Sequence, residues 1–456
     1  MKAFSYPILL LALFFGSSIF AQDSIPDNKS FTINGFANGT YYGLSKSFDI
    51  SSAYGELGLK VSGNKGNSRF VTDFRVRSGS FFGENKTIMD LKEAFAEYSS
   101  DYFEVSLGKR IVKYGKASSF NPTDNVCPKD YFFLSSDMED MQMSNFMLKT
   151  NIKPANWLNI ELIAIPVYTP SIYRYDLFDM NYELSDMDLP LPPAFADQKV
   201  EVSFHEYTLP EISFENMSYS ARIGTQFSFA DISLTGFHGY DPFYGFKINN
   251  FAIIPSLSLV NQAEFYKKTS LGLSLSVPAG SWLFTAEGAY NHTEDYKDSI
   301  FIPNPEFYYV AGLEKDIFGV KIIGEYIGRY VLDFEEKPVP LFPSNPAELG
   351  NYMNNMLAHQ IGDFNNKVFS QSQKISHAMM VTLHRDFFYE TITGDLSFLY
   401  NFTTDEKLMR AAVKWKLSDE LALSAGGQFM DGPKESIFDY AGSIMSGIFF
   451  SMKYSF

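Results

Sequence analysis

The chain has 456 residues, a net charge of −16 and a single cysteine, Cys127. The acidic balance argues against a nucleic-acid-binding surface. One cysteine excludes an internal disulfide and argues against a Cys-rich metal site. Aromatic residues make up 17% of the chain, mostly Phe and Tyr, which favour strands and membrane interfaces.

The first residues carry the features of an export signal. A basic start at Lys2 precedes an apolar run from Ile8 to Phe15 and a small-residue stretch ending at Ala21. The apolar run is too short for a membrane-spanning helix, which needs about 20 residues. We therefore predict a cleaved signal peptide over 1–21 and a single exported domain over 22–456. Gln22 at the expected cleavage point argues against a lipid anchor.

Alternating apolar and polar residues predict β-strands along the rest of the chain. The stretch 68–78 shows the pattern most clearly. Its two faces carry Phe70, Thr72, Phe74 and Val76 on one side and Arg69, Asp73, Arg75 and Arg77 on the other. A strand with one apolar and one charged face suits a wall between lipid and water.

The same reading predicts eighteen strands. In chain order they cover 31–44, 53–63, 68–78, 88–98, 102–114, 143–152, 157–167, 217–229, 231–240, 263–278, 281–292, 306–316, 318–331, 374–385, 387–402, 407–417, 421–430 and 442–456. The stretch 251–260 fits either a hairpin within a loop or a strand extension, so sixteen strands is the alternative.

The predicted connections alternate in length. Short turns fall at 63–67, 99–101, 152–156, 230–231, 279–280, 316–317, 386 and 418–420, and long connections at 115–142, 168–216, 241–262 and 332–373. Short periplasmic turns, long extracellular loops and an even strand number are typical of bacterial outer-membrane barrels. An open sheet edge would leave backbone groups unsatisfied in lipid. The predicted fold class is therefore an all-β transmembrane antiparallel barrel of about 18 strands, a size that encloses an aqueous channel.

Strand periodicity also predicts which charged side chains line the channel. The candidates are Arg69, Asp73, Arg75, Arg77, Glu93, Glu97, Glu104, Arg110, Arg222, Lys321, Glu325, Arg329, Arg410 and Lys414. Opposed acidic and basic rows would tune solute selectivity. The alternative is that these charges form pairs that brace the barrel. Strict alternation turns Lys109 toward lipid, so we expect a β-bulge near it.

Any constriction must come from loops that fold inward, because too few residues precede the first strand to form a plug domain. The connections 115–142 and 168–216 are the candidates, with Asp124, Lys129 and Asp130 in the first. The alternative is that these loops form a solvated outer cap. Within 332–373, residues Pro346 to Ile361 predict a short surface helix.

Two segments of the chain carry a recognisable motif. The run Leu107 to Gly115 has a glycine, a basic pair and an aromatic-Gly, followed by Pro122-Thr123-Asp124 and Pro128-Lys129-Asp130. This run resembles a segment of Gram-negative outer-membrane porins, and the stretch Gly272 to Tyr290 is similar to the same family. The resemblance implies a porin of the cell outer membrane, a passive channel for small hydrophilic solutes. The chain departs from the pattern in having no arginine near Gln142 to Asn145.

A second function remains open, that of an accessory barrel in a secretion or surface-assembly complex. An enzyme is not predicted, because His205-Glu206 lacks the second His of a zinc-protease motif and no nucleophile elbow or phosphate-binding loop occurs. The sequence predicts no cofactor and no metal site.

The end of the chain predicts a partner. The segment 448–456 alternates and stops on Phe456, and such an end resembles the signal read by the barrel-assembly machinery of the outer membrane. The remaining expected partners are outer-membrane lipid and small hydrophilic solutes. The sequence does not distinguish a monomer from a trimer.

Overall fold

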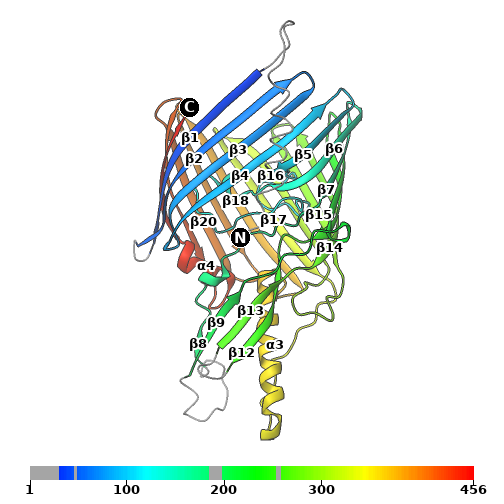
Figure 1. Cartoon of the computed structure of the whole chain (residues 1–456), viewed down its shortest axis with the longest axis vertical. Helices are drawn as coiled ribbons and strands as arrows, with labels where there is room; N and C mark the ends of the chain where they lie inside the picture. The colour runs from blue at the N-terminus through cyan, green and yellow to red at the C-terminus, as the bar shows by residue number, and fades with distance from the viewer. Residues whose placement is uncertain (1–29, 46–48, 184–197, 253–257) are drawn as a thin grey trace.

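A computed structural model describes residues 30–45, 49–183, 198–252 and 258–456, so the predicted signal peptide at 1–21 lies outside the described residues. Eighteen strands form one closed antiparallel barrel (Figure 1). All eighteen predicted strands are present, which confirms the count and the fold class. No helix among the described residues combines the length and hydropathy needed to cross a membrane.

Each barrel strand pairs with the next in chain order. The strands are β1 Ser30–Leu44, β2 Ile50–Lys65, β3 Ser68–Phe81, β4 Glu84–Ser99, β5 Phe103–Arg110, β6 Asn145–Ala155, β7 Leu158–Ile165, β10 Ser218–Gln226, β11 Asp231–Tyr240, β14 Lys267–Ala279, β15 Trp282–Thr293, β16 Glu306–Ile317, β17 Val320–Val331, β18 Ile375–Phe387, β19 Ile392–Asn401, β20 Glu406–Lys416, β21 Leu421–Asp431 and β22 Gly447–Ser455.

The barrel closes where β1 pairs with β22, from Phe36 opposite Ser455 to Leu44 opposite Gly447. Beyond this ladder, Gly35 and Phe456 exchange two backbone hydrogen bonds of 2.8 and 2.9 Å. The Phe456 ring lies against Gly35, where an added Cβ would stand 2.3 Å from the ring. A glycine at position 35 therefore lets the last aromatic ring lie across the seam.

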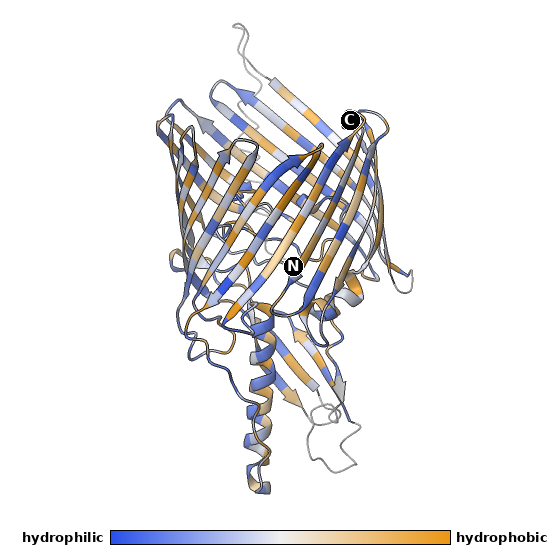
Figure 2. Ribbon diagram, turned by 180° about the vertical axis from the view of Figure 1, so that it is seen from behind, coloured by the Kyte–Doolittle hydropathy of each residue, from blue (hydrophilic) through white to orange (hydrophobic). Residues whose placement is uncertain are grey.

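Side chains alternate across the wall as predicted. On β3, Phe70 and Phe74 are about 40% exposed on the outer face, whereas Val71 and Asp73 are buried inside. Figure 2 shows the same alternation of polar and apolar residues along the other strands. Because the outward residues of neighbouring strands pair in register, they form a continuous apolar band.

Three local predictions need correction. The strand predicted to reach residue 114 ends at Arg110, because the chain turns into the lumen there. The last strand begins at Gly447, since helix α4 (Ile437–Met445) occupies the preceding residues and is capped by the Ser436 hydroxyl. The register shift expected near Lys109 lies in β4 instead, where Lys92 is the extra residue between the partners of Asp73 and Phe74.

A smaller sheet lies beyond the long-loop end of the barrel, at the bottom of Figure 1. Its order is β12, β13, β9, β8, with β13 and β9 parallel. The strands are β8 Tyr182–Glu183, β9 Lys199–His205, β12 Gly245–Ala252 and β13 Ser258–Glu264. The ambiguous stretch 251–260 therefore belongs to a loop hairpin; residues 253–257 of it lie outside the described residues.

Helix α3 (Leu349–Val368) packs on this sheet through Leu357, which is buried with Val200 and Leu259. The helix predicted within 346–361 is thus present but runs further. Short 3-10 helices complete the elements: η1 Met138–Met141, η2 Tyr175–Leu177, η4 Phe214–Asn216 and η5 Pro346–Glu348.

An apolar core joins the small sheet to the barrel mouth. Tyr175, Tyr244, Phe246 and Phe364 form edge-to-face and tilted ring contacts with centroids about 5.0 to 6.4 Å apart. Phe132, from the β5–β6 connection, packs in the same cluster. The connection 168–216 therefore contributes to an outer cap, while the β5–β6 connection links that cap to the lumen.

Candidate channel constriction

The connection between β5 and β6, residues 111–144, folds into the barrel and is called the lumen loop below. Its polar groups contact the inner wall on many strands. The wall residues that bond to it include Tyr54, Arg75, Lys92, Glu161, Ser270, Glu287, Glu325, Arg410 and Ser451. Since these residues come from strands all around the barrel, the loop spans the lumen.

Two buried carboxylates hold the first half of the lumen loop. Glu287 on β15 accepts the backbone N–H groups of Lys116 and Ala117, the latter at 2.6 Å, and the Thr123 hydroxyl at 3.1 Å. An irregular segment has no neighbouring strand whose carbonyl groups accept hydrogen bonds from its N–H groups. The Glu287 carboxylate supplies these acceptors instead. Hydrogen bonds to a charged acceptor are also the stronger kind.

Glu325 on β17 accepts the next two backbone N–H groups of the lumen loop. Its two carboxylate oxygens accept the N–H groups of Ser118 at 2.5 Å and Ser119 at 3.1 Å. Glu325 is only 2% exposed. Sequence periodicity predicted Glu325 as a pore-lining residue, and the structure gives it a loop-anchoring position.

Cations hold the second half of the loop. The Arg410 guanidinium on β20 donates to the carbonyl oxygens of Ser136 at 2.7 Å and Ser135 at 3.3 Å. Arg75 on β3 donates to the Asp140 carboxylate at 3.0 Å. The bulged Lys92 donates to the carbonyl oxygens of Asp140, at 2.8 Å, and of Gln142.

The resemblance led us to expect an arginine near Gln142 to Asn145. The chain has none there, and the cations that bind this part of the loop come from the wall. Burial by itself would raise the pKa of Asp140. The hydrogen bond from Ser135 and the charge of Arg75 outweigh burial and hold that pKa below its ordinary value.

The three loop residues predicted at the constriction shape the loop itself. The Asp124 carboxylate accepts the N–H of Tyr114 at 3.2 Å and lies 3.8 Å from the Lys129 ammonium. Asp130 accepts the N–H of Phe132 at 3.0 Å. Burial raises the pKa of both aspartates.

Most of the predicted pore-lining charges form ion pairs on the inner wall. Arg77 contacts Glu56 at 2.9 Å, and Arg329 contacts Glu306 at 2.8 Å. The remaining pairs are Arg75 with Asp73, Arg110 with Glu97 and Glu104, and Lys321 with Glu314, while Glu93 accepts the N–H of Ile111. The bracing interpretation therefore describes most of these side chains. Arg69 and Lys414 are exposed and have no ion pair in the described part of the chain.

Arg222 on β10 is an exception with chemical consequences. It is paired in register with Glu161 on β7, yet no ion pair joins them among the described residues. Glu161 is instead bound by the Lys149 ammonium at 2.8 Å and the Tyr114 hydroxyl at 2.6 Å. The Arg222 guanidinium lies 5.4 Å from the Tyr114 ring centroid, and its buried Nε has no hydrogen-bond partner.

A polar cavity of about 520 Å³ lies beside Arg222, toward the short-turn end of the lumen. Its lining includes Lys116 of the lumen loop, Trp157, Asn159 and Asp231. Lys116 is paired with Asp231 at 3.2 Å. The cavity is thus lined by the unpaired Arg222 guanidinium, by neutral hydrogen-bonding groups and by aromatic surface. Further charged residues in the lining are Asp101, Lys153 and Glu161.

Sequence reasoning missed the anchoring role of the wall carboxylates. Glu161 and Glu287 lie on the polar face of predicted strands, so the same two-residue period could have selected them. The bulged Lys92 carried no such signal, because an extra residue reverses the face assignment locally.

No protein-family model matches the chain, and no curated protein matches it. Solved structures match it at low identity. The outer membrane protein opdK of Pseudomonas aeruginosa is 8% identical with a TM-score of 0.52, the match covering 94% of this chain and 99% of that one.

Two further structures are similar. OccK2 (OpdF) of Pseudomonas aeruginosa, solved in complex with glucuronate, is 9% identical with a TM-score of 0.51, covering 94% of this chain and 97% of that one. OccAB3 of Acinetobacter baumannii is 9% identical with a TM-score of 0.51, covering 94% and 99%. At these identities the likeness is one of fold, and it confirms the β-barrel predicted from the sequence.

Proposed function

We propose that this chain is a porin of the Gram-negative outer membrane, a channel through which small hydrophilic solutes diffuse passively. The observation that carries the proposal is a closed barrel with an apolar outer face and a charged lumen, crossed by a loop anchored to the wall by Glu287 and Glu325. A barrel of this strand number encloses an aqueous channel. An anchored loop narrows such a channel without needing a plug domain.

The unpaired Arg222 guanidinium beside the loop favours solutes that carry an acidic group and hydroxyl groups. Arg222 offers guanidinium donors that no carboxylate of the described residues occupies, and Asn159 and Thr225 line the same cavity. A guanidinium binds carboxylates in a bidentate fashion. Glucuronate, bound by one structurally similar protein, is a solute of this kind.

A passive channel needs no catalytic group, and we propose that the chain is not an enzyme. The similar structures include an outer membrane protein and a barrel solved with bound glucuronate, which supports this view. We also propose that residues 1–21 are removed on export, that 22–456 act as a single unit, and that Phe456 is read by the barrel-assembly machinery.

The test is a conductance measurement on the purified full chain in planar bilayers, together with liposome swelling in sugars and sugar acids. We expect discrete conductance steps and faster swelling in small solutes than in large ones. Liposomes with heat-denatured protein are the control. A correctly folded barrel that gives neither steps nor swelling would contradict the channel.

A further inference from the structure

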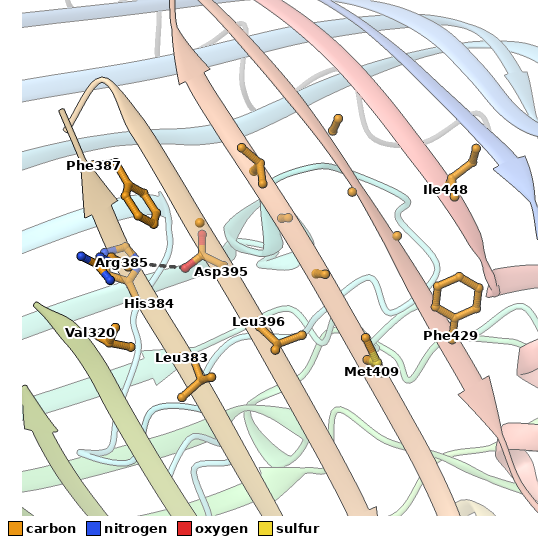
Figure 3. Close-up of a pocket in the computed structure, with 17 residues that line it drawn as sticks. Val320, Leu383, His384, Arg385, Phe387, Asp395, Leu396, Met409, Phe429 and Ile448 are labelled. Carbon is orange, nitrogen blue, oxygen red and sulfur yellow. Dashed lines mark hydrogen bonds and ion pairs between the residues drawn. The ribbon is translucent and has the colours of Figure 1, made fainter. Parts of the chain in front are cut away.

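An apolar groove of about 500 Å³ lies on the wall formed by β18 to β22. We call it the wall groove (Figure 3). Its flanks are Phe387, Leu396, Met409, Phe429 and Ile448, all of which lie on the lipid-facing side and are 37–46% exposed. Between them, Gly394 and Ala411 are too small to fill the surface. The groove therefore follows the outer wall from the short-turn end of the barrel toward the long-loop end.

A cation stands at the turn end of the groove. Arg385 is paired in register with Gly394, so its side chain leaves the outer face, while His384 beside it faces Asp395 across the ladder at 2.7 Å. The Arg385 guanidinium lies 4.8 Å from the Phe387 ring centroid. It forms no ion pair within the described residues.

A second outward cation lies close by on β16. Lys315 is paired with Trp282, and its ammonium stands 4.1 Å from that ring centroid. It too has no carboxylate partner in the described part of the chain. Lys315 is in register with Ile322, and Ile322 with Leu383. The two cations are thus two strands apart and offset by two residues, or about 10 Å and 7 Å at standard sheet spacings.

We propose that the wall groove and the pair Lys315 and Arg385 form a binding site for an anionic phospholipid. Its phosphate would contact the two cations, and an acyl chain would lie in the groove. This inference rests on the proposed outer-membrane location, which puts the turn end of the barrel in the periplasmic leaflet.

Charge complementarity favours a lipid over a second copy of the chain. Two unpaired cations on an otherwise apolar, lipid-facing surface attract an anion, and an anionic lipid brings one together with the apolar chain that the groove accommodates. A second copy meeting this face symmetrically would bring its own Lys315 and Arg385, so that like charges would face each other.

The test is native mass spectrometry of the full chain in detergent, with either phosphatidylglycerol or phosphatidylcholine added. We expect wild type to retain phosphatidylglycerol preferentially. Each of Lys315→Gln and Arg385→Gln should reduce that retention by about fivefold, the effect of one interfacial cation. Lys374→Gln is the matched control, because Lys374 is exposed and lies over the Tyr330 ring at the opposite end of the barrel.

A second variant tests the groove itself. Gly394→Leu should reduce the retention of both lipids, because the leucine side chain would fill the groove. The barrel should accept the substitution, since a Cβ at this position makes only ordinary contacts, 3.7 Å from Phe387 and 4.0 Å from the Arg385 carbonyl oxygen. Heat-modifiable migration on gels checks that each variant folds. If Gly394→Leu does not fold, the lipid retention of Lys315→Gln and Arg385→Gln tests the proposal.

Equal retention of both lipids by wild type, or an equal loss in Lys374→Gln, would overturn the site. A dimer of the chain that Gly394→Leu abolishes would assign the groove to a second copy and also overturn it. Conductance in neutral bilayers separates this proposal from the channel. Lost lipid preference with intact conductance refutes the lipid site alone, whereas intact preference without conductance refutes the channel alone.

Discussion

The carboxylate of Glu325, on β17, accepts the backbone N–H of Ser118 in the lumen loop at 2.5 Å. The two residues are 207 positions apart, so the hydrogen bond forms only when the barrel has closed around the loop. The same carboxylate takes the next N–H, of Ser119, with its other oxygen. One side chain of the wall therefore holds two consecutive N–H groups of the loop.

Replacing this anchor should loosen the constriction. In Glu325→Gln the amide can accept only one of the two N–H groups and turns its own N–H donors toward the other. We expect a cost of about 1–3 kcal/mol at the loop, seen as larger and noisier single-channel conductance. Glu314→Gln is the control, because Glu314 faces the lumen but contacts Lys321 instead of the loop. Unchanged conductance in Glu325→Gln would show that the other anchors suffice.

Arg222 should set the preference between anions and cations. Arg222→Gln removes a guanidinium that has no carboxylate partner in the described structure, so no buried acid is left unpaired. We expect the reversal potential in a salt gradient to shift toward cation preference, and the shift to shrink at high salt as the charge is screened. The exposed Lys374→Gln should leave it unchanged. An identical shift in both variants would place the selective charge elsewhere.

The last residue should matter more for assembly than for stability. Deleting Phe456 removes one exposed ring and the two backbone hydrogen bonds to Gly35. An apolar side chain contributes about 2 kcal/mol when fully buried, and Phe456 is 65% exposed. We expect membrane levels of the protein to fall much more than the unfolding midpoint of refolded protein. Parallel losses in both measurements would make Phe456 an ordinary packing residue.

A charge on the outer face should oppose insertion. Phe74 lies on the apolar side of β3, so Phe74→Arg should cost about 2–4 kcal/mol if the position is near the middle of the bilayer. Urea titration of protein folded into vesicles measures this cost. The paired substitution Phe74→Leu keeps the face apolar and should cost less. A water-facing wall would tolerate both changes equally.

Two loop aspartates should respond to pH with opposite signs. The pKa of Asp140 is lowered in the folded state, so its contribution to stability is present above its unfolded pKa and is lost as pH falls through the folded value. The pKa of Asp124 is raised, so its contribution is greatest at low pH and is lost as pH rises through the folded value.

We therefore expect Asp140→Asn to lower the unfolding temperature at pH 7. On acidification, the unfolding temperature of this variant should fall less than that of wild type. Asp124→Asn should raise the unfolding temperature at pH 7 relative to wild type. Thermal unfolding of both variants between about pH 3 and pH 7, the range that brackets carboxyl titration, checks the two signs. Shifts of the same sign in both variants would contradict this assignment.

Several features of the barrel could be predicted from the sequence because they are local. The alternation of Phe70, Thr72, Phe74 and Val76 with charged residues identifies the two faces of a strand without reference to any other segment. Turn residues mark the strand ends in the same local way. The eighteen strands, their faces and the alternation of short and long connections follow from these two signals.

The tertiary structure decided which charges are free and where the loops go. Arg110 and Arg222 have the same local signal on the polar face of a strand, yet Arg110 contacts Glu97 and Glu104 while Arg222 forms no ion pair among the described residues. The difference arises because Lys149 and Tyr114 already occupy Glu161. Ion pairing and the path of the lumen loop depend on contacts between segments that closure of the barrel brings together, and no period along the chain encodes them.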